Sequence, residues 1–184
     1  MTLIGYWPLN ETSGSTAYDH SGNEKHGDLI GGAGPTGTGI QNGVLGQPSY
    51  AFDGSDDYVS ITENQEWAKS GNSFSISLWI KSSDSTNDTN MGLVSNYHSS
   101  NGQTPFFMVG FDGSDFYFNI RDNSDNFTSA NVNRNSVIDN NWHYVCAVRN
   151  NGTGQITLSI DGVKMDAVND ISSDVNYQDK IYLM

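Results

Sequence analysis

The sequence predicts an all-β fold, a two-sheet antiparallel β-sandwich, and three observations predict it. Charged residues make up only 16% of the 184-residue chain, and its polarity comes from Ser, Asn, Gly and Thr, which favour turns over helices. Val, Ile, Phe, Tyr and Trp supply the apolar runs, as is typical of strands. About a dozen short runs are separated by turns, a spacing typical of sandwiches. Because no repeat, linker or change of composition divides the chain, we expect one domain over residues 1–184.

The clearest strand is predicted at residues 74–81, where apolar and polar side chains alternate. Phe74, Ile76, Leu78 and Ile80 share one face, and the residues between them share the other. Residues 10–48 are expected to form a long loop with one short strand near Gly43–Leu45, and a helical turn is expected around Glu63–Lys69. The other predicted strands are Leu3–Leu9, Tyr50–Asp53, Tyr58–Ile61, Met91–Ser95, Phe106–Phe111, Phe116–Ile120, Trp142–Arg149, Gln155–Ile160, Val163–Met165 and Ile181–Met184.

Charge and composition exclude several classes of partner. The net charge of −13 disfavours nucleic acid, because phosphate binding needs clustered Lys and Arg. The single cysteine, Cys146, cannot form an intramolecular disulfide. No apolar run approaches the roughly 20 residues of a membrane span, so no membrane insertion is expected. No signal peptide is visible before Leu3, and we expect the chain to reach an extracellular, cell or virion surface by another route or within a larger protein.

Five motifs follow one another along the chain: Gly5–Glu11 with Ser13-Gly14, Asp19–Asn23, Phe52–Gly54 with Asp57–Val59, Phe74–Ile80, and Trp142–Val145 with Ile156–Gly162. In this order they resemble the motifs of laminin G-like domains of the concanavalin A-like lectin/glucanase family. The resemblance implies a concanavalin A-like jelly roll of two antiparallel sheets packed face to face, binding to sugars or proteins, and often a calcium ion.

One departure from this family concerns the end of the chain. Domains of this type usually continue past the position of Ile181–Met184 into a last strand, and here the sequence stops. We therefore expect the C-terminal strand to be missing or supplied by a neighbouring chain of a parent assembly. An unpaired strand edge favours such association.

Two acidic turns are candidates for a structural calcium site. Asp19 and Asn23 occupy one turn, and Asp53 and Asp56 occupy the other. Calcium binds about 6–8 oxygen ligands from carboxylates, amides and carbonyls. The alternative is that these residues only make the local hydrogen bonds of turns.

Two regions are candidates for sugar binding, because sugar sites join aromatic rings to polar side chains. On the non-core face of the strands we expect Trp79 beside Tyr117, Asn119 and Arg121. The alternative is that Trp79 is packed within the fold. A loop rim offers the second set, Tyr97, His98, Asn101 and Asn123 together with Asp122 and Phe127.

The function predicted from these observations is a non-catalytic carbohydrate-binding or adhesion module that recognises a glycan surface. The alternative is a structural or adhesion component of a viral or cell-surface assembly. A polysaccharide-cleaving enzyme is disfavoured, because the chain has only four Glu and no Glu-x-Asp-x-Glu strand of the glucanase type. We predict no catalytic residues.

Overall fold

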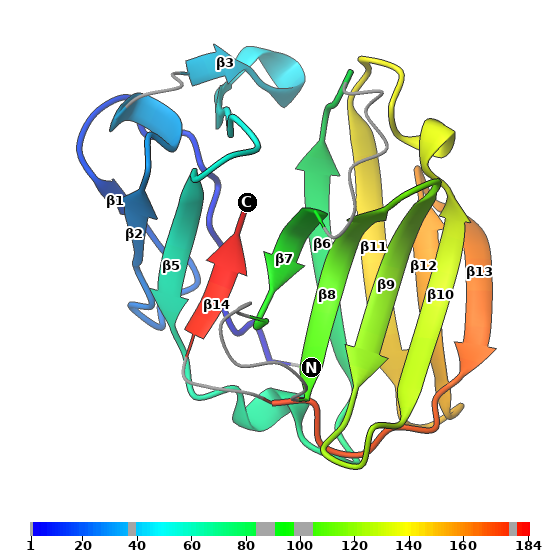
Figure 1. Cartoon of the computed structure of the whole chain (residues 1–184). Coiled ribbons are helices and arrows are strands. Elements are labelled where there is room, and N and C mark those ends of the chain that lie inside the picture. Colours follow the sequence, from blue (N-terminus) through cyan, green and yellow to red (C-terminus); the bar gives the residue numbers. More distant parts are fainter. Residues whose placement is uncertain (1, 37–39, 84–90, 98–104, 177–179) are drawn as a thin grey trace. The chain divides into compact units, whose positions relative to one another are not determined.

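The computed structural model describes residues 2–36, 40–83, 91–97, 105–176 and 180–184 (Figure 1). The chain forms two compact units, which we describe separately. Unit 1 comprises residues 1–63 and 179–184, and unit 2 comprises residues 64–178. The single domain expected over residues 1–184 therefore remains a prediction.

Unit 1 contains four antiparallel strands in the order β1-β2-β5-β14 and a small β3-β4 pair. Val59 and Ile61 of β5 are fully buried, whereas the intervening Ser60 pairs with Asp28 of β2 and Tyr182 of β14. The elements are β1 (Thr16–Ala17), β2 (Gly27–Ile30), 3-10 helix η1 (Gly34–Thr36), β3 (Ile40–Asn42), 3-10 helix η2 (Val44–Gly46), β4 (Pro48–Tyr50), β5 (Tyr58–Thr62) and β14 (Lys180–Leu183).

The strand predicted at Leu3–Leu9 is wrong, because this segment has no regular secondary structure. Pro8 has no N–H to donate to a ladder, and Leu9 has a positive φ of 53°, which ends an extended run. The backbone groups of the segment are instead satisfied by a turn further along the chain. Tyr6 donates its N–H to the Asp19 carboxylate and accepts a hydrogen bond from the N–H of His20.

Unit 2 is a β-sandwich of two antiparallel four-stranded sheets, with the orders β7-β8-β9-β10 and β13-β12-β11-β6 (Figure 1). Its strands are β6 (Phe74–Ile80), β7 (Met91–Ser95), β8 (Phe106–Asp112), β9 (Asp115–Arg121), β10 (Phe127–Asn133), β11 (His143–Asn150), β12 (Gln155–Ile160) and β13 (Val163–Asn169). Among its described residues the same unit also has the 3-10 helices η3 (Glu66–Ala68) and η5 (Arg134–Ser136).

The core of unit 2 lies between these sheets. Phe74 of β6 contacts Phe107 and Phe118 of the facing sheet, with ring centroids 5.8 and 6.2 Å apart. Trp67 packs edge-on against Phe74 at 5.1 Å. Because alternate residues of a strand point to opposite faces, each strand that supplies core residues also presents a second set of side chains on the outer face of its sheet.

A segment without regular structure, residues 170–175, runs along one end of the unit 2 strands; we call it the closing segment (Figure 1). Arg149 of β11 is buried and holds it by an ion pair with Asp170 at 2.7 Å and by hydrogen bonds to the carbonyls of Ser172 and Ser173. Val175 donates its N–H to the carbonyl of Ala68 at 3.2 Å.

The structure confirms the all-β antiparallel sandwich, including most of the predicted strands. The alternation at residues 74–81 corresponds to β6, and the runs at 91–95 and 155–160 correspond to β7 and β12. The structure also contains strands that we did not predict, among them β1, β2, β3 and β10, and the run predicted at Tyr50–Asp53 is a strand only at Tyr50, where β4 ends. The segment near Gly43–Leu45 forms a 3-10 helix rather than a strand.

Candidate functional site

The first acidic turn of unit 1 is organised around the buried carboxylate of Asp19. Its Oδ1 accepts hydrogen bonds from the N–H groups of Tyr6 at 2.9 Å and Ser21 at 2.8 Å. Its Oδ2 accepts from the Ser21 hydroxyl at 2.8 Å and the Lys25 N–H at 3.1 Å. Burial alone would raise the pKa of Asp19, but these hydrogen bonds outweigh it and lower the pKa to about 2.

Asn23 in the same turn also binds the chain itself. Its side-chain amide donates to the carbonyls of Leu3 at 2.9 Å and Ile4 at 3.1 Å. Together Asp19 and Asn23 hold the N-terminal segment through Leu3, Ile4 and Tyr6, so both predicted metal ligands have a structural role in the turn.

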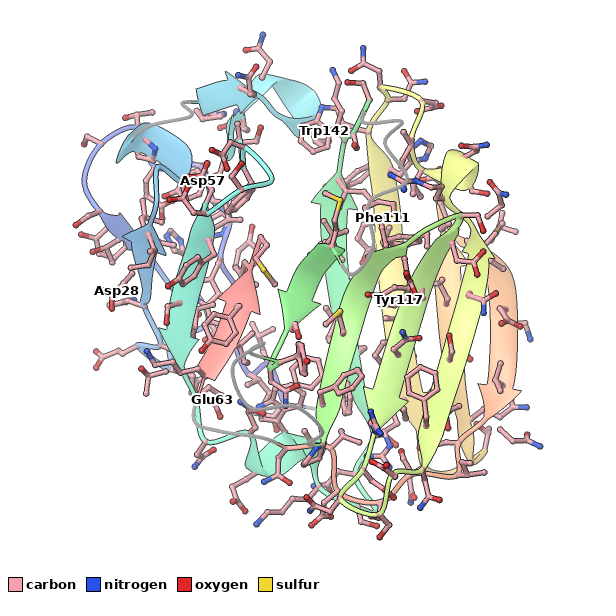
Figure 2. All side chains as sticks on the ribbon, in the orientation of Figure 1. Asp28, Asp57, Glu63, Phe111, Tyr117 and Trp142 are labelled. Carbon is pink, nitrogen blue, oxygen red and sulfur yellow. The ribbon has the colours of Figure 1, made fainter. Side chains whose placement is uncertain are left out.

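The second acidic turn, between β4 and β5, gathers three carboxylates. Asp53, Asp56 and Asp57 each offer one oxygen, and these oxygens lie within 4.8 Å of one another. Asp57 is buried and accepts from the N–H groups of Gly32 and Asp53, whereas Asp53 and Asp56 are exposed. Figure 2 shows Asp57 at one end of β5 and Glu63 at the other.

The backbone around this turn is closely packed. Gly31 has a φ of +74°, and a Cβ there would lie 2.4 Å from the Asp56 carbonyl oxygen and 2.9 Å from Asp57 Oδ1. Two of the four predicted metal ligands, Asp53 and Asp56, lie together in this cluster, which also contains Asp57. Asp19 lies in the first acidic turn and does not belong to the cluster, and the Asn23 amide binds the carbonyls of Leu3 and Ile4. Clustered carboxylate oxygens on a turn are chemically suited to calcium.

In unit 2, three predicted sugar-binding residues lie on the outer face of β9. Phe116, Phe118 and Ile120 are buried, so Tyr117, Asn119 and Arg121 point to the other face. Tyr117 lies midway along the strand (Figure 2) but is only 3% exposed, and its hydroxyl donates to the Met108 sulfur at 2.9 Å. Burial and the nearby Asp112 charge raise the pKa of Tyr117 to about 12.

Because Tyr117 is buried, its ring offers little exposed surface to a sugar, and its predicted role in sugar binding stays a prediction. Asn119 differs, since it is half-buried and its buried Oδ1 has no hydrogen-bond partner among the described residues. A buried acceptor without a donor costs about 1–3 kcal/mol.

An aromatic cluster lies at the end of the same face; we call Tyr97, Phe106, Phe127 and Arg121 the rim cluster. The register places Arg121 opposite both Phe106 and Phe127. The centroid of the Phe106 ring lies 5.3 Å from that of Tyr97 and 6.4 Å from that of Phe127. The Phe127 side chain is 48% exposed. Arg121 forms an ion pair with Asp125 at 2.7 Å. Phe106 was not predicted as a site residue, because in sequence it is only the first residue of an apolar strand.

The turn between β9 and β10 carries the exposed Asn123 beside this cluster. Buried Asp122 organises the turn by accepting from the N–H groups of Ser124 at 2.8 Å and Asn126 at 3.0 Å. It also accepts from the N–H of Ser173 in the closing segment at 2.8 Å. Burial opposes ionisation, but these hydrogen bonds hold the pKa of Asp122 well below its usual range. His98 and Asn101, predicted for the same rim, lie outside the described residues.

Trp79 lies on the other sheet of unit 2, on the outer face of β6. The expected adjacency of Trp79 to Tyr117 is therefore wrong, since strands that alternate alike in sequence can belong to different sheets. Trp79 is 50% exposed and is not packed within the fold. It pairs across the strands with Tyr144 of β11, at a ring distance of 5.3 Å and an interplanar angle of 49°.

Comparison with known proteins relates this chain to one protein family. A laminin G model, described as the concanavalin A-like lectin/glucanases superfamily, matches residues 53–182, which is more than half of the chain. A search of the curated proteins finds no match. No helix within the described ranges has the length and apolarity needed to span a membrane.

Several solved structures share the fold at low sequence identity. The binding domain of Paraclostridial Mosquitocidal Protein 1 has a TM-score of 0.74 and 16% identity, over 97% of this chain and 44% of that one. The receptor-binding domain of botulinum neurotoxin D has a TM-score of 0.70 and 17% identity, with the same coverages. Domains LG4-5 of the mouse laminin alpha1 chain have a TM-score of 0.54 and 15% identity, over 68% of this chain and 31% of that one. The chain thus spans less than half the length of each of these structures.

Proposed function

We propose that this chain, which belongs to the concanavalin A-like lectin/glucanase superfamily, is a non-catalytic module that binds a glycan at its rim cluster. The observation that carries the proposal is the row of three rings, Tyr97, Phe106 and Phe127, on the outer face of β7–β10. Rings of this kind stack against the apolar faces of sugar rings. A surface location, extracellular or on a cell or virion, accords with such a role.

Polar groups beside the rings supply the hydrogen bonds that sugar hydroxyls need. The exposed side-chain amide of Asn123 offers both donors and an acceptor. The Arg121 guanidinium has five N–H groups, of which two are directed at Asp125. The net charge of −13 repels anionic sugars, so a neutral oligosaccharide is the proposed class of ligand.

Binding without catalysis accords with the structural neighbours, which are named as binding domains of toxins and as laminin domains. A protein ligand is the second candidate, because the related binding domain of botulinum neurotoxin DC was solved in complex with rat synaptotagmin II. Adhesion within a viral or cell-surface assembly would use such a protein contact.

Calcium is the proposed structural cofactor of unit 1. Asp53 and Asp56 would hold it through their exposed carboxylates, with Asp57 contributing from the buried side of the turn. The chemical fit is good, because Asp57 already fixes the backbone of the turn through Gly32 and Asp53. When bound, the ion would neutralise the repulsion among the three carboxylates.

Glycan binding is tested with an array of neutral and acidic oligosaccharides, followed by calorimetry on the best neutral binder. We expect Phe127→Ala to weaken binding about tenfold, because a stacked ring of this kind contributes about 0.5–1.5 kcal/mol beyond its buried area. Tyr18→Ala is the matched control, since it removes an aromatic side chain of similar exposure, 49%, from unit 1.

Two outcomes would contradict the glycan proposal. One is the absence of binding to any sugar at millimolar concentration. The other is a Phe127→Ala variant that binds as tightly as the parent chain, which would place the sugar elsewhere. Capture of a defined receptor fragment by the parent chain, without any sugar binding, would favour the protein ligand instead.

A further inference from the structure

The outer face of the second sheet of unit 2 carries an aromatic pair that the rim cluster does not use. Trp79 and Tyr144 are cross-strand neighbours on β6 and β11, and 50% and 37% of their surfaces are exposed. The next residues in register, Leu78 and Val145, point into the core, and Val145 is fully buried. The pair therefore lies on the outer face rather than at the edge of the core.

Short side chains line one side of this aromatic pair. Ser77, Cys146 and Ser159 form one row across β6, β11 and β12, directly beside the rings. Thr157 lies one row further along β12, on the same face. The serine and threonine hydroxyl groups are thus close to the two rings.

The outward side chains at the described positions of β6, β11 and β12 are uncharged, and charged groups lie at the margin of the face, where Asp161 Oδ1 accepts the Tyr144 N–H at 2.9 Å and Lys164 of β13 pairs with Ser159. The outward residues on β6, β11 and β12 are Ser75, Ser77, Trp79, Tyr144, Cys146, Val148, Asn150, Gln155, Thr157 and Ser159. The chain as a whole carries 21 acidic and 8 basic residues, so the uncharged outward positions of these three strands are a local property. A neutral sugar matches them, because it offers an apolar face to the two rings and hydroxyls to the polar side chains beside them.

We propose that the Trp79–Tyr144 pair is a second neutral-sugar site, so that unit 2 binds glycan on both of its outer faces. The inference rests on the proposed function in its ligand class but uses different residues on a different sheet. Two sites on opposite sheets allow one module to join two glycan chains. On a dense glycan surface this bivalency strengthens attachment beyond the affinity of either site.

The test uses the same neutral oligosaccharide and the full chain. Calorimetry is expected to give two sugars bound per chain for the parent, one for Trp79→Ala, one for Phe127→Ala and none for the double variant. Trp79→Phe keeps a ring and is expected to retain two sites. Tyr18→Ala is the control with an unchanged stoichiometry, and circular dichroism verifies that each variant is folded.

Tryptophan fluorescence separates the two sites, because the rim cluster contains Tyr and Phe but no Trp. Sugar binding is expected to shift the emission of the parent chain and of Phe127→Ala but not that of Trp79→Phe. Trp67 packs against Phe74 and Phe107, and Trp7 donates to the Lys25 carbonyl, so neither lies at the second site. Trp142 lies two residues before Tyr144, so the comparison is made in a Trp142→Phe background in which only Trp79 reports on this face.

The possible failures are distinguishable. If Trp79→Ala leaves one site with unchanged affinity and the parent also has one, the second site is refuted and the proposed function stands. If Phe127→Ala changes nothing and Trp79→Ala abolishes all binding, the rim site is refuted and the second site stands. If the parent chain binds no sugar, both are refuted.

Discussion

The two acidic turns of unit 1 begin alike and end differently. Each starts with Asp-x-Ser, and in each the Ser N–H donates to the Asp Oδ1 at 2.8 Å, from Ser21 in the first turn and Ser55 in the second. At Asp19 further donors arrive from Tyr6 and Lys25, which engage both carboxylate oxygens. At Asp53 the further N–H donor comes from within the turn, and the side chain stays exposed. The same local motif thus holds the N-terminal segment in the first turn, whereas in the second turn it leaves the Asp53 carboxylate exposed.

The largest expected effect on stability comes from removing the Asp19 carboxylate. Asp19→Ala leaves the N–H groups of Tyr6, Ser21 and Lys25 without their acceptor, so we expect the free energy of unfolding to fall by roughly 3 kcal/mol. Urea unfolding followed by circular dichroism measures this change. Asp19→Asn keeps one acceptor oxygen and is expected to lose less. If the free energy of unfolding of Asp19→Ala stayed within about 0.5 kcal/mol of the parent's, the long-range hydrogen bonds of Asp19 would not stabilise the fold, and the two turns would be equivalent in this respect.

The second-largest expected effect is the loss of stability at acid pH, which acts through the same Asp19 carboxylate. The folded-state pKa of Asp19 is lowered from 3.8 to about 2, so its contribution is present above pH 3.8 and is lost as the pH falls through 2. The difference corresponds to roughly 2–3 kcal/mol. Unfolding measured between pH 5 and pH 2 checks this, with Asp19→Asn as the control that lacks this titrating group. An identical pH dependence in both proteins would contradict the assignment.

The smallest effect on stability is expected at the exposed turn. Asp53→Asn with Asp56→Asn keeps the amide oxygens but removes two charges, so without calcium the unfolding free energy should change by less than about 0.5 kcal/mol. The parent chain should gain stability on addition of calcium, and the double variant should not. Asp28→Asn, at an exposed site on β2 (Figure 2), is the single-charge control and should respond like the parent. A calcium response retained by the double variant would exclude this cluster as the site.

The fold could be predicted from the sequence because alternation is a local property. Residues 74–81 alternate strictly, and the structure places Phe74 and Ile80 in the core and Ser75, Ser77 and Trp79 outside. β10 was missed because its sequence, Phe-Thr-Ser-Ala-Asn-Val-Asn, is rich in residues that favour turns. Its strand structure depends on pairing with β9, which local composition does not reveal.

The sites were less predictable, because they depend on which strands share a sheet. Trp79 and Tyr117 both stand on outward positions of their strands, and nothing local shows that β6 and β9 belong to different sheets. Tyr144 was overlooked as a site residue for the same reason, since only the β6–β11 register places it beside Trp79. In the acidic turns the long-range donors of Asp19 could not be foreseen from the motif.

The closing segment has a consequence for recognition at the rim. Ser173 of this segment donates two hydrogen bonds to Asp122, at 2.8 and 3.0 Å, and Arg149 anchors the segment to β11. The turn that presents Asn123 is thereby ordered when the protein folds, before any ligand arrives. An incoming ligand need not immobilise this stretch of chain, and the entropy of ordering it does not weaken the complex.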